Sequence, residues 1–243
     1  MTSPAAASTP SFDPASLQAI TLDLDDTLWP VWPAIDRAEA VLHDWLRVHA
    51  PATAARHDTA ALRRLREAVA LERPDWVRAH DLGAMRLESI RRALVAAGDD
   101  PALAAPAFEL FLEHRQRVDL YPDVLPALRR LAARWPLVAL SNGNADIQRV
   151  PGIGELFVGA VSAFRLGCGK PEAAAFEAAC AVVGAAPART LHVGDDAALD
   201  VDGALDAGLQ AAWVERVDGL RPPRGQPQHR VADLLTLAQR LGV

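Results

Sequence analysis

The sequence predicts an α/β protein: a parallel-sheet core with helices on both faces of the sheet, and an inserted α-helical domain. Three observations lead to this prediction. Short apolar runs of strand composition recur along the chain, helical segments separate the later runs, and a long stretch without a strand follows the first run. Strands that alternate with helices at these lengths are typical of a parallel sheet covered on both faces.

Five apolar runs have the length and the aliphatic composition of buried strands. They span Ala19–Leu24, Leu137–Leu140, Val158–Ser162, Thr190–Val193 and Ala211–Val214. The helices of the core are expected at Pro122–Arg134, Pro171–Val183, Asp200–Ala207 and Asp233–Leu241. A core of this kind is Rossmann-like, and ligands bind such sheets at the edge formed by the carboxyl ends of the strands.

The interruption between Pro30 and Asp119 has apolar residues at helical spacing and no convincing strand. It predicts helices at Ala34–Val48, Thr59–Leu71, Met85–Ala97 and Ala102–Val118. Pro106 lies inside the last of these, so that helix is expected to start later or to kink there. The expected domains are a flexible N-terminal segment (1–17), the core (18–29 and 119–243) and the helical insert (30–118).

Composition limits the class of protein. A chain of 243 residues with 51% apolar residues can bury a sizeable core, and a net charge of −6 without a basic run argues against a nucleic-acid partner. No apolar stretch approaches the ~20 residues that cross a membrane. The N-terminus lacks the features of a secretory signal, and two cysteines form no disulfide framework. We therefore expect a cytoplasmic protein, with its oligomeric state left open.

Three carboxylates lie within four positions where the first predicted strand ends: Asp23, Asp25 and Asp26. Like charges this close repel and lose hydration, so one carboxyl takes up a proton or a cation lies among them. Alternate residues of an extended chain point the same way, which pairs Asp23 with Asp25. Such a pair suits Mg²⁺, a nucleophile and a general acid/base. A solvated acidic turn is the alternative interpretation.

Two further strand ends carry polar groups. Ser141 and Asn142 follow the second predicted strand, with Gly143 next, and this hydroxyl, amide and backbone could hold phosphate oxygens. Asp195 and Asp196 follow another strand, with Asp200 shortly beyond. These segments, and the end of the first strand, are expected to meet at one edge of the sheet.

Lys170 is the only lysine among the 25 lysine and arginine residues of the chain. It lies in the loop Gly167-Cys168-Gly169-Lys170-Pro171-Glu172, which ends at a proline suited to the first turn of a helix. An ammonium is a compact point charge, whereas a guanidinium is a planar fork. Beside the aspartate cluster we interpret Lys170 as a phosphate-binding group; a surface lysine is the alternative.

These segments resemble, in order, the four motifs of the haloacid dehalogenase-like hydrolases. The matching strings are Asp23-Leu24-Asp25-Asp26-Thr27-Leu28, Leu140-Ser141-Asn142-Gly143-Asn144, Lys170-Pro171, and His192-Val193-Gly194-Asp195-Asp196 with Asp200 and Gly203-Ala204. The resemblance covers about residues 19–29 and 120–216. More narrowly, Ser-Asn-Gly-Asn-Ala, His-Val-Gly-Asp-Asp and Gln210-Ala211-Ala212-Trp213-Val214 resemble a bacterial phosphatase branch that acts on flavin mononucleotide and on the ribitylaminouracil phosphate of riboflavin biosynthesis.

The resemblance implies roles for the aspartates. Asp23 would attack phosphorus and form an aspartyl-phosphate, and Asp25 would protonate the leaving alcohol and then accept a proton from water. Mg²⁺ would bind the Asp23 carboxylate, the Asp25 backbone carbonyl and Asp195. Asp200 and Asp196 would support the metal waters or Lys170, and whether either contacts the metal directly or through water is left open.

The resemblance also implies a phosphate-binding set. Ser141 and Lys170 would hold the phosphoryl oxygens. Asn142 would orient the substrate or the loop, and Thr27 would orient the first motif by hydrogen bonding. The helical insert resembles a cap domain, which closes over an active site, excludes water and supplies specificity.

The expected function is therefore a Mg²⁺-dependent phosphatase for a small phosphorylated metabolite, with flavin mononucleotide or 5-amino-6-(5-phospho-D-ribitylamino)uracil as the suggested substrate. The alternatives are a phosphomutase acting on a sugar phosphate and, in a different class, a non-catalytic binding protein on the same scaffold. A dehalogenase is disfavoured, because the dehalogenase pattern hydrolyses a carbon ester and needs neither a proton donor at the position of Asp25 nor a metal. No nucleic-acid or membrane partner is expected.

Four other residues have simpler interpretations. His192 and Trp213 are expected to pack within the sheet. Arg86 is expected to form a salt bridge inside the insert, with a contact to a phosphate or carboxylate of the substrate as the alternative. Trp29 either stacks on a planar substrate or packs the hinge between core and insert.

Overall fold

Six parallel strands form one sheet in the order β3-β2-β1-β4-β5-β6. The computed structural model describes residues 14–217 and 219–243. The strands are β1 (Ala19–Leu22), β2 (Leu137–Ser141), β3 (Phe157–Ser162), β4 (Thr190–Gly194), β5 (Gln210–Val214) and β6 (His229–Val231). This order reverses direction between β1 and β4, and in open α/β sheets the ligand crevice lies at that reversal. The predicted Rossmann-like parallel sheet is confirmed.

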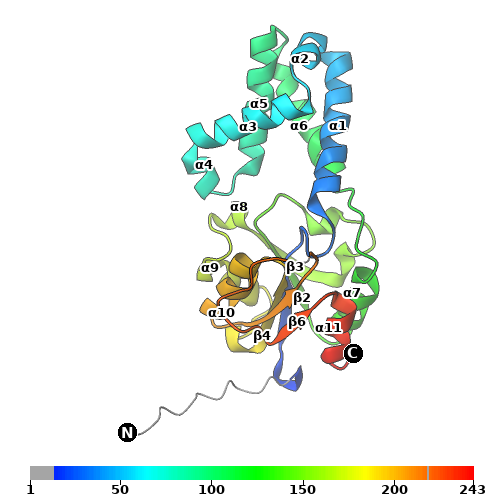
Figure 1. The fold of residues 1–243 in the computed structure, drawn as a ribbon, viewed down its shortest axis with the longest axis vertical. Helices are drawn as coiled ribbons and strands as arrows, with labels where there is room; N and C mark the ends of the chain where they lie inside the picture. The colour runs from blue at the N-terminus through cyan, green and yellow to red at the C-terminus, as the bar shows by residue number, and fades with distance from the viewer. Residues whose placement is uncertain (1–13, 218) are drawn as a thin grey trace.

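Helices cover both faces of the sheet (Figure 1). On one face, α7 (Val124–Ala132) and α11 (Leu234–Arg240) pack against residues of β1 and β2 such as Ile20, Leu22 and Leu137. On the other face, α9 (Ala173–Ala181) and α10 (Gly203–Asp206) pack against neighbouring residues of β2 and β5. Successive residues of β2 thus enter opposite cores. This two-sided cover explains why β1, β2 and β4 are buried at every position rather than at alternate ones.

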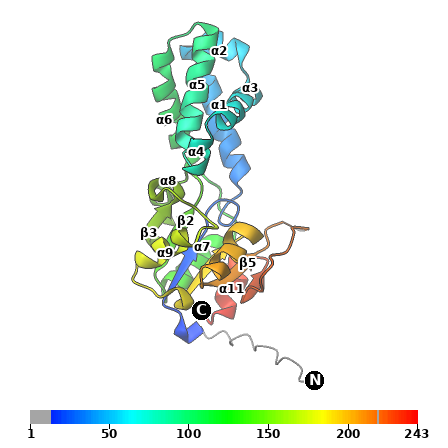
Figure 2. The same cartoon turned by 90° about the vertical axis from the view of Figure 1, so that its left-hand side faces the viewer.

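The insert between β1 and β2 is helical and stands above the carboxyl edge of the sheet (Figures 1 and 2). Its helices are α1 (Val31–His49), α2 (Pro51–Arg56), α3 (Thr59–Glu72), α4 (Pro74–Arg78), α5 (Leu82–Ala97) and α6 (Ala104–Arg115). A separate apolar cluster, to which all of these helices except α4 contribute, includes Leu42, Leu46, Ile90 and Phe111. The chain crosses between core and insert twice, before α1 and after α6. We refer to the insert as the cap.

Some expected boundaries differ from the structure. The expected flexible segment comprised residues 1–17. Residues 1–13 lie outside the described residues, whereas Pro14–Ser16 form a 3₁₀ helix and Leu17 is buried in the core. Pro106 falls in the first turn of α6, where a missing backbone N–H removes no helical hydrogen bond. The strand β6 was not predicted, because three residues give too short a pattern.

The helix expected at Asp200–Ala207 begins earlier, as a π-helical turn at Ala197–Asp202 that continues into α10. A short helix, α8 (Ala163–Leu166), also follows β3. Among the described residues, every helix is too short or too polar to cross a bilayer.

Candidate active site

Three strand ends bring the motif residues together at the carboxyl edge of the sheet. Asp23 follows β1, Ser141 ends β2, and Asp195 follows β4. Because β1 lies between β2 and β4, these residues lie side by side at the reversal of strand order. The sequence had predicted this convergence from motif positions alone, and the register of the three strands brings it about.

Lys170 joins this group from the loop before α9. Its Nζ lies 2.5 Å from Asp23 Oδ1 and 2.6 Å from Asp200 Oδ1, and the lysine is only 4% exposed. Burial opposes the ammonium charge, but the Asp200 and Asp23 carboxylates outweigh it and raise the pKa of Lys170. The lysine is therefore a permanent buried cation that bridges two aspartates.

The surroundings of Asp23 disfavour a negative charge there, even beside this cation. Burial, together with the charges of Asp200 and Asp195, raises the pKa of Asp23, although Lys170 opposes the shift. Thr27 Oγ1 lies 3.4 Å from Asp23 Oδ2. One oxygen of Asp23 is thus fixed by Lys170, while the other has only a long contact.

Asn142 fixes the lysine loop. Its amide donates to the Lys170 carbonyl and accepts from the Lys170 backbone N–H, both at 2.8 Å. Of the two roles expected for Asn142, the structure supports the orientation of a loop rather than contact with substrate. Gly169 is needed at this junction, because a Cβ there would lie 2.5 Å from Asn142 Oδ1 and 2.8 Å from His80 Nε2.

Hydrogen bonds run from Asp200, the partner of Lys170, to His192 and on to Thr21. His192 Nε2 lies 3.1 Å from Asp200 Oδ1, and His192 Nδ1 lies 2.8 Å from Thr21 Oγ1. Burial lowers the pKa of His192, so the ring is neutral. A carboxylate only accepts, so Nε2 carries the proton and Thr21 donates to Nδ1. His192 was expected to be a packing residue; it packs edge-on against Phe176 but also orients Asp200.

Asp195 completes a set of carboxylates suited to a cation. Oxygen atoms of Asp23, Asp195 and Asp200 lie within 4.8 Å of one another. Burial and the charge of Asp200 raise the pKa of Asp195 to about 7, while a 2.7 Å hydrogen bond from Thr27 to its Oδ1 opposes the shift. Hard oxygen donors with uncompensated charge fit a divalent cation such as Mg²⁺.

Asp200 has less capacity for a metal than the other two carboxylates. Its Oδ1 contacts Lys170 and His192, and its Oδ2 accepts from the Asp196 backbone N–H at 2.9 Å. Although burial opposes ionisation, Lys170 and His192 lower the pKa of Asp200. Asp23 and Asp195 are therefore the better direct ligands.

The carboxylate of Asp196 lies elsewhere. Asp196 is exposed, and its Oδ1 accepts from the backbone N–H groups of Ala198 and Leu199, which caps the π-helical turn. The structure therefore places the Asp200 side chain, but not that of Asp196, against Lys170. This corrects the expectation that both aspartates act on the lysine. A run of aspartates mixes helix caps with site residues, since both favour the same residue type.

Asp26 is likewise a structural residue. Its Oδ1 accepts from the Val31 N–H at 2.8 Å where α1 begins, and its backbone has a positive φ of 60°. Burial raises the pKa of Asp26. The third carboxylate of the first motif thus forms the turn that leads the chain into the cap.

Asp25 is held by two donors that lie outside the core motifs. Trp29 Nε1 donates to Asp25 Oδ1 at 2.8 Å, and Arg115 Nη2 lies 2.6 Å from Oδ1 and 2.7 Å from Oδ2. Trp29 therefore packs the hinge and orients Asp25, which decides between its two expected roles. Arg115 was missed, because it lies 90 positions from Asp25 and carries no local motif.

Ser141 and Gly143 form the wall beside these aspartates. Ser141 is buried, and its Oγ accepts from the Gly143 N–H at 3.0 Å. A Cβ on Gly143 would lie 2.6 Å from Asp25 Oδ2, so only glycine fits. The expected salt bridge of Arg86 is confirmed: Nη1 lies 3.0 Å from Glu39 Oε1 inside the cap.

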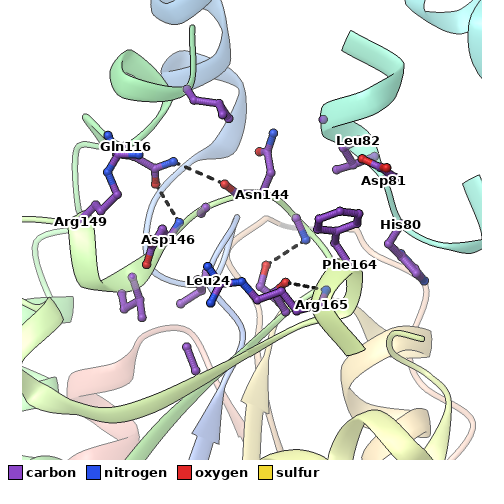
Figure 3. A pocket seen from close by; sticks show the side chains of 18 of the residues that line it. Leu24, His80, Asp81, Leu82, Gln116, Asn144, Asp146, Arg149, Phe164 and Arg165 are labelled. Carbon is purple, nitrogen blue, oxygen red and sulfur yellow. Dashed lines mark hydrogen bonds between the residues drawn. The ribbon is translucent and has the colours of Figure 1, made fainter. Parts of the chain in front are cut away.

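A cavity of about 540 Å³ opens beside this wall, between the core and the cap. Ser141, Gly143 and Leu24 contribute to its floor. Figure 3 shows polar and charged groups around it, including His80 and Asp81 from the cap and Arg149 and Arg165 from the core. Apolar side chains of α5, α6 and α8 complete the lining: Leu82, Leu87, Phe108, Leu112 and Phe164.

Comparison with known proteins identifies the family. The model of one family, described as haloacid dehalogenase-like hydrolase, matches residues 17–208. The chain belongs to the haloacid dehalogenase-like hydrolases. The resemblance found in the motifs is thereby confirmed, as is the expectation that the protein is a hydrolase.

Two curated relatives of the chain are phosphatases by name. The chain is 34% identical over 207 residues to 5-amino-6-(5-phospho-D-ribitylamino)uracil phosphatase YigB of Escherichia coli, covering 84% of this chain and 85% of the relative. It is 37% identical over 159 residues to phosphoserine phosphatase of Thermus thermophilus, covering 63% of each.

Solved structures of the family share the whole fold. A 2-haloacid dehalogenase from Pseudomonas syringae is 35% identical with a TM-score of 0.83, covering 93% of this chain and 98% of that chain. The hydrolase YfnB of Bacillus subtilis, determined with bound magnesium, is 17% identical with a TM-score of 0.65, covering 93% and 99%. The second similarity supports the fold alone.

Proposed function

We propose that this hydrolase is a Mg²⁺-dependent phosphatase that acts on a small phosphorylated metabolite through an aspartyl-phosphate at Asp23. One observation carries the proposal: two carboxylates on the same side of a strand end, Asp23 and Asp25, have different partners. Asp23 is bound to a buried ammonium, as suits a nucleophile that meets phosphate. Asp25 accepts hydrogen bonds on both oxygens beside the cavity wall, as suits a group that exchanges protons with the leaving alcohol.

The reaction follows from these positions. An oxygen of Asp23 attacks phosphorus, the bond from phosphorus to the alcohol oxygen breaks, and Asp25 delivers a proton to that oxygen. Water then attacks the phosphorus of the aspartyl-phosphate and gives a proton to Asp25. The bond from phosphorus to the Asp23 oxygen breaks, which restores the Asp23 carboxylate and releases inorganic phosphate. Lys170 and Ser141 hold the phosphoryl oxygens during both transfers.

Asp23, Asp195 and the backbone carbonyl of Asp25 are the groups that would hold the cation. When bound, Mg²⁺ supplies positive charge that lets a phosphate dianion approach the crowded carboxylates. Thr27 orients Asp195 for this purpose, with a hydrogen bond of 2.7 Å.

The cavity favours a substrate larger than phosphoserine. A space of about 540 Å³ with an apolar cap wall suits a planar ring joined to its phosphate by a polar chain. Phosphoserine would leave much of this space to water. Together with the similarity to YigB, this points to 5-amino-6-(5-phospho-D-ribitylamino)uracil, with flavin mononucleotide as the second candidate.

Dehalogenation is the second candidate function, because a structure of 35% identity is described as a 2-haloacid dehalogenase. That reaction displaces halide from carbon, and halide leaves without a proton. It gives no purpose to an acid/base at Asp25 or to a cation beside Asp195. The charges at this site therefore favour phosphate over a halogenated acid.

The test measures phosphate release from ribitylaminouracil phosphate, flavin mononucleotide, phosphoserine and a sugar phosphate, each with Mg²⁺ and with chelator. Halide release from 2-chloropropionate is followed in parallel. Mg²⁺-dependent release from the first two esters supports the proposal. Halide release without phosphate release assigns the chain to the dehalogenases, and release from the sugar phosphate or phosphoserine alone excludes the proposed substrate.

Asp206→Asn, which alters an exposed carboxylate at the end of α10 that pairs with Arg224, is the control for every active-site variant.

A further inference from the structure

The two crossings between core and cap each send a side chain to the same carboxylate. Trp29 lies immediately before α1, on the first crossing, and Arg115 is the last residue of α6, where the second crossing begins. Both donate to Asp25. The orientation of Asp25 therefore depends on segments that link two separately packed cores.

The contact with Arg115 is close and shielded from water. One nitrogen, Nη2, lies 2.6 Å and 2.7 Å from the two oxygens of Asp25, and the arginine is 1% exposed. Among the described residues, its Nε and Nη1 are buried without a hydrogen-bond partner. A buried guanidinium held by one carboxylate fixes that carboxylate strongly, because moving apart would leave both charges unpaired.

Gln116, the residue after Arg115, contacts the loop that follows β2. Gln116 Oε1 accepts from the Asp146 N–H at 2.8 Å, and its Nε2 lies 3.4 Å from the Asn144 carbonyl (Figure 3). The end of α6 thus contacts the loop after β2 as well as the loop after β1. Gly143, in the loop after β2, limits the space for Asp25 from the other side.

We propose that Arg115 is a positioning residue that directs the Asp25 carboxylate toward the leaving-group oxygen. The inference rests on the proposed function, in which Asp25 exchanges that proton. Arg115 itself reaches the substrate through Asp25 alone. It therefore acts on bond breaking where the leaving group needs a proton, and leaves phosphate binding unchanged.

The test compares Arg115→Met and Arg115→Lys with the control Arg117→Met. Methionine keeps the apolar stem and removes all donors, whereas lysine keeps one charged donor group. Arg117 lies two positions further along the chain, is mostly exposed and pairs with Glu113. All variants are first compared with the wild type by circular dichroism and thermal melting.

The kinetic readout is kcat/KM for two esters, flavin mononucleotide and p-nitrophenyl phosphate. The first releases an alkoxide that needs a proton, and the second a phenolate that does not. In Arg115→Met we expect a loss of about 100-fold for the alkyl ester and less than about 3-fold for the aryl ester. Arg115→Lys recovers part of the alkyl loss, and the inhibition constant of inorganic phosphate changes by less than about 2-fold in both.

Equal losses for the two esters, or weaker inhibition by phosphate, would overturn the proposal in favour of a structural or a substrate-binding role. If Arg115→Met does not fold, Arg115→Lys decides. The lysine side chain is one bond shorter, so its ammonium does not reach the position from which Nη2 contacts both oxygens. A loss of about 10-fold on the alkyl ester supports positioning, and no loss overturns it.

A crystal structure of the variant gives a readout that needs no turnover. We expect the Asp25 side chain to leave its present position in Arg115→Met and to keep it in Arg117→Met; an unmoved Asp25 in Arg115→Met refutes positioning. If the wild type hydrolyses neither ester, the proposed function fails and the role at the leaving group fails with it. The position of Asp25 in Arg115→Met then still decides whether Arg115 positions this carboxylate.

Discussion

Asp23 and Asp25 lie two residues apart at one strand end, but side chains from different parts of the fold hold their carboxylates. Asp23 is held by Lys170, which Asp200 and His192 support from within the sheet. Asp25 is held by Trp29 and Arg115, which stand on the crossings to the cap. Neighbouring positions of one motif can therefore respond to different parts of the fold: the nucleophile to the core, and the acid/base to the linkers.

The strongest test of this comparison removes the nucleophile itself. Asp23→Asn is expected to lower kcat by at least about 10⁴-fold, because an amide does not form the acyl-phosphate. The fold survives, since Lys170 keeps Asp200 as a partner. Steady-state turnover and thermal melting measure the two effects. Turnover by pure Asp23→Asn, with deamidation excluded by mass spectrometry, would remove Asp23 as the nucleophile.

Removing the cation that holds Asp23 should be nearly as severe. Lys170→Met leaves Asp23 and Asp200 buried without their counter-charge, so we expect a loss of about 10²–10³-fold in kcat/KM and of about 3–5 kcal/mol in unfolding free energy. Urea unfolding and turnover measure these losses. Glu172→Gln, an exposed change in the same loop, is the matched control. A Lys170→Met protein as stable as the wild type would contradict the charge assignment.

A third test uses the pH dependence of stability that Asp195 causes in the metal-free protein. Because the pKa of Asp195 is raised to about 7 in the folded protein, Asp195 loses its proton at a lower pH in the unfolded chain than in the folded one. This group therefore lowers stability progressively between about pH 4 and pH 7. Asp195→Asn should raise the melting temperature of metal-free protein at pH 8 but not at pH 4.

The same variant should abolish the stabilisation by Mg²⁺, because it removes a charged ligand. Thermal melting of wild type and Asp195→Asn, with Mg²⁺ and with chelator at both pH values, checks this prediction. Equal Mg²⁺ stabilisation of the two proteins would place the cation elsewhere.

The smallest effect is expected at His192, which supports Lys170 only indirectly, through its hydrogen bond to Asp200. His192→Phe keeps the contact with Phe176 but removes the hydrogen bond to Asp200 and leaves the Thr21 hydroxyl unpaired. We expect about a 10-fold loss of kcat and about 1–3 kcal/mol of stability. Adding Thr21→Val should restore most of the stability but not the rate. Recovery of both would reduce His192 to a packing residue.

The sequence predicted the convergence of polar groups where their positions follow from the strands. Asp23 and Asp195 follow strands and Ser141 ends one, so the parallel sheet brings them to one edge, and Lys170 joins them from a short loop. Residues that join the site from the cap follow no such rule. Arg115 is one of 24 arginines and reaches Asp25 only because α6 ends there.

Aspartates that are neighbours in the sequence have different roles in the structure. Asp26 and Asp196 lie beside site carboxylates but cap the turns that follow. Nothing in their local sequence separates a capping aspartate from one that faces the site, since backbone N–H groups and cations both attract carboxylates. The choice depends on the direction of the backbone after the strand, which the tertiary fold determines.

The burial of Lys170 has a consequence for chemical modification. It is the only lysine in the sequence, and its amine lies between two carboxylates in the closed floor of the site. Acylating reagents and lysine acetyltransferases therefore find no exposed lysine side chain on this protein. Any that reached Lys170 would have to open the catalytic centre first, so its acylation would report local unfolding rather than surface chemistry.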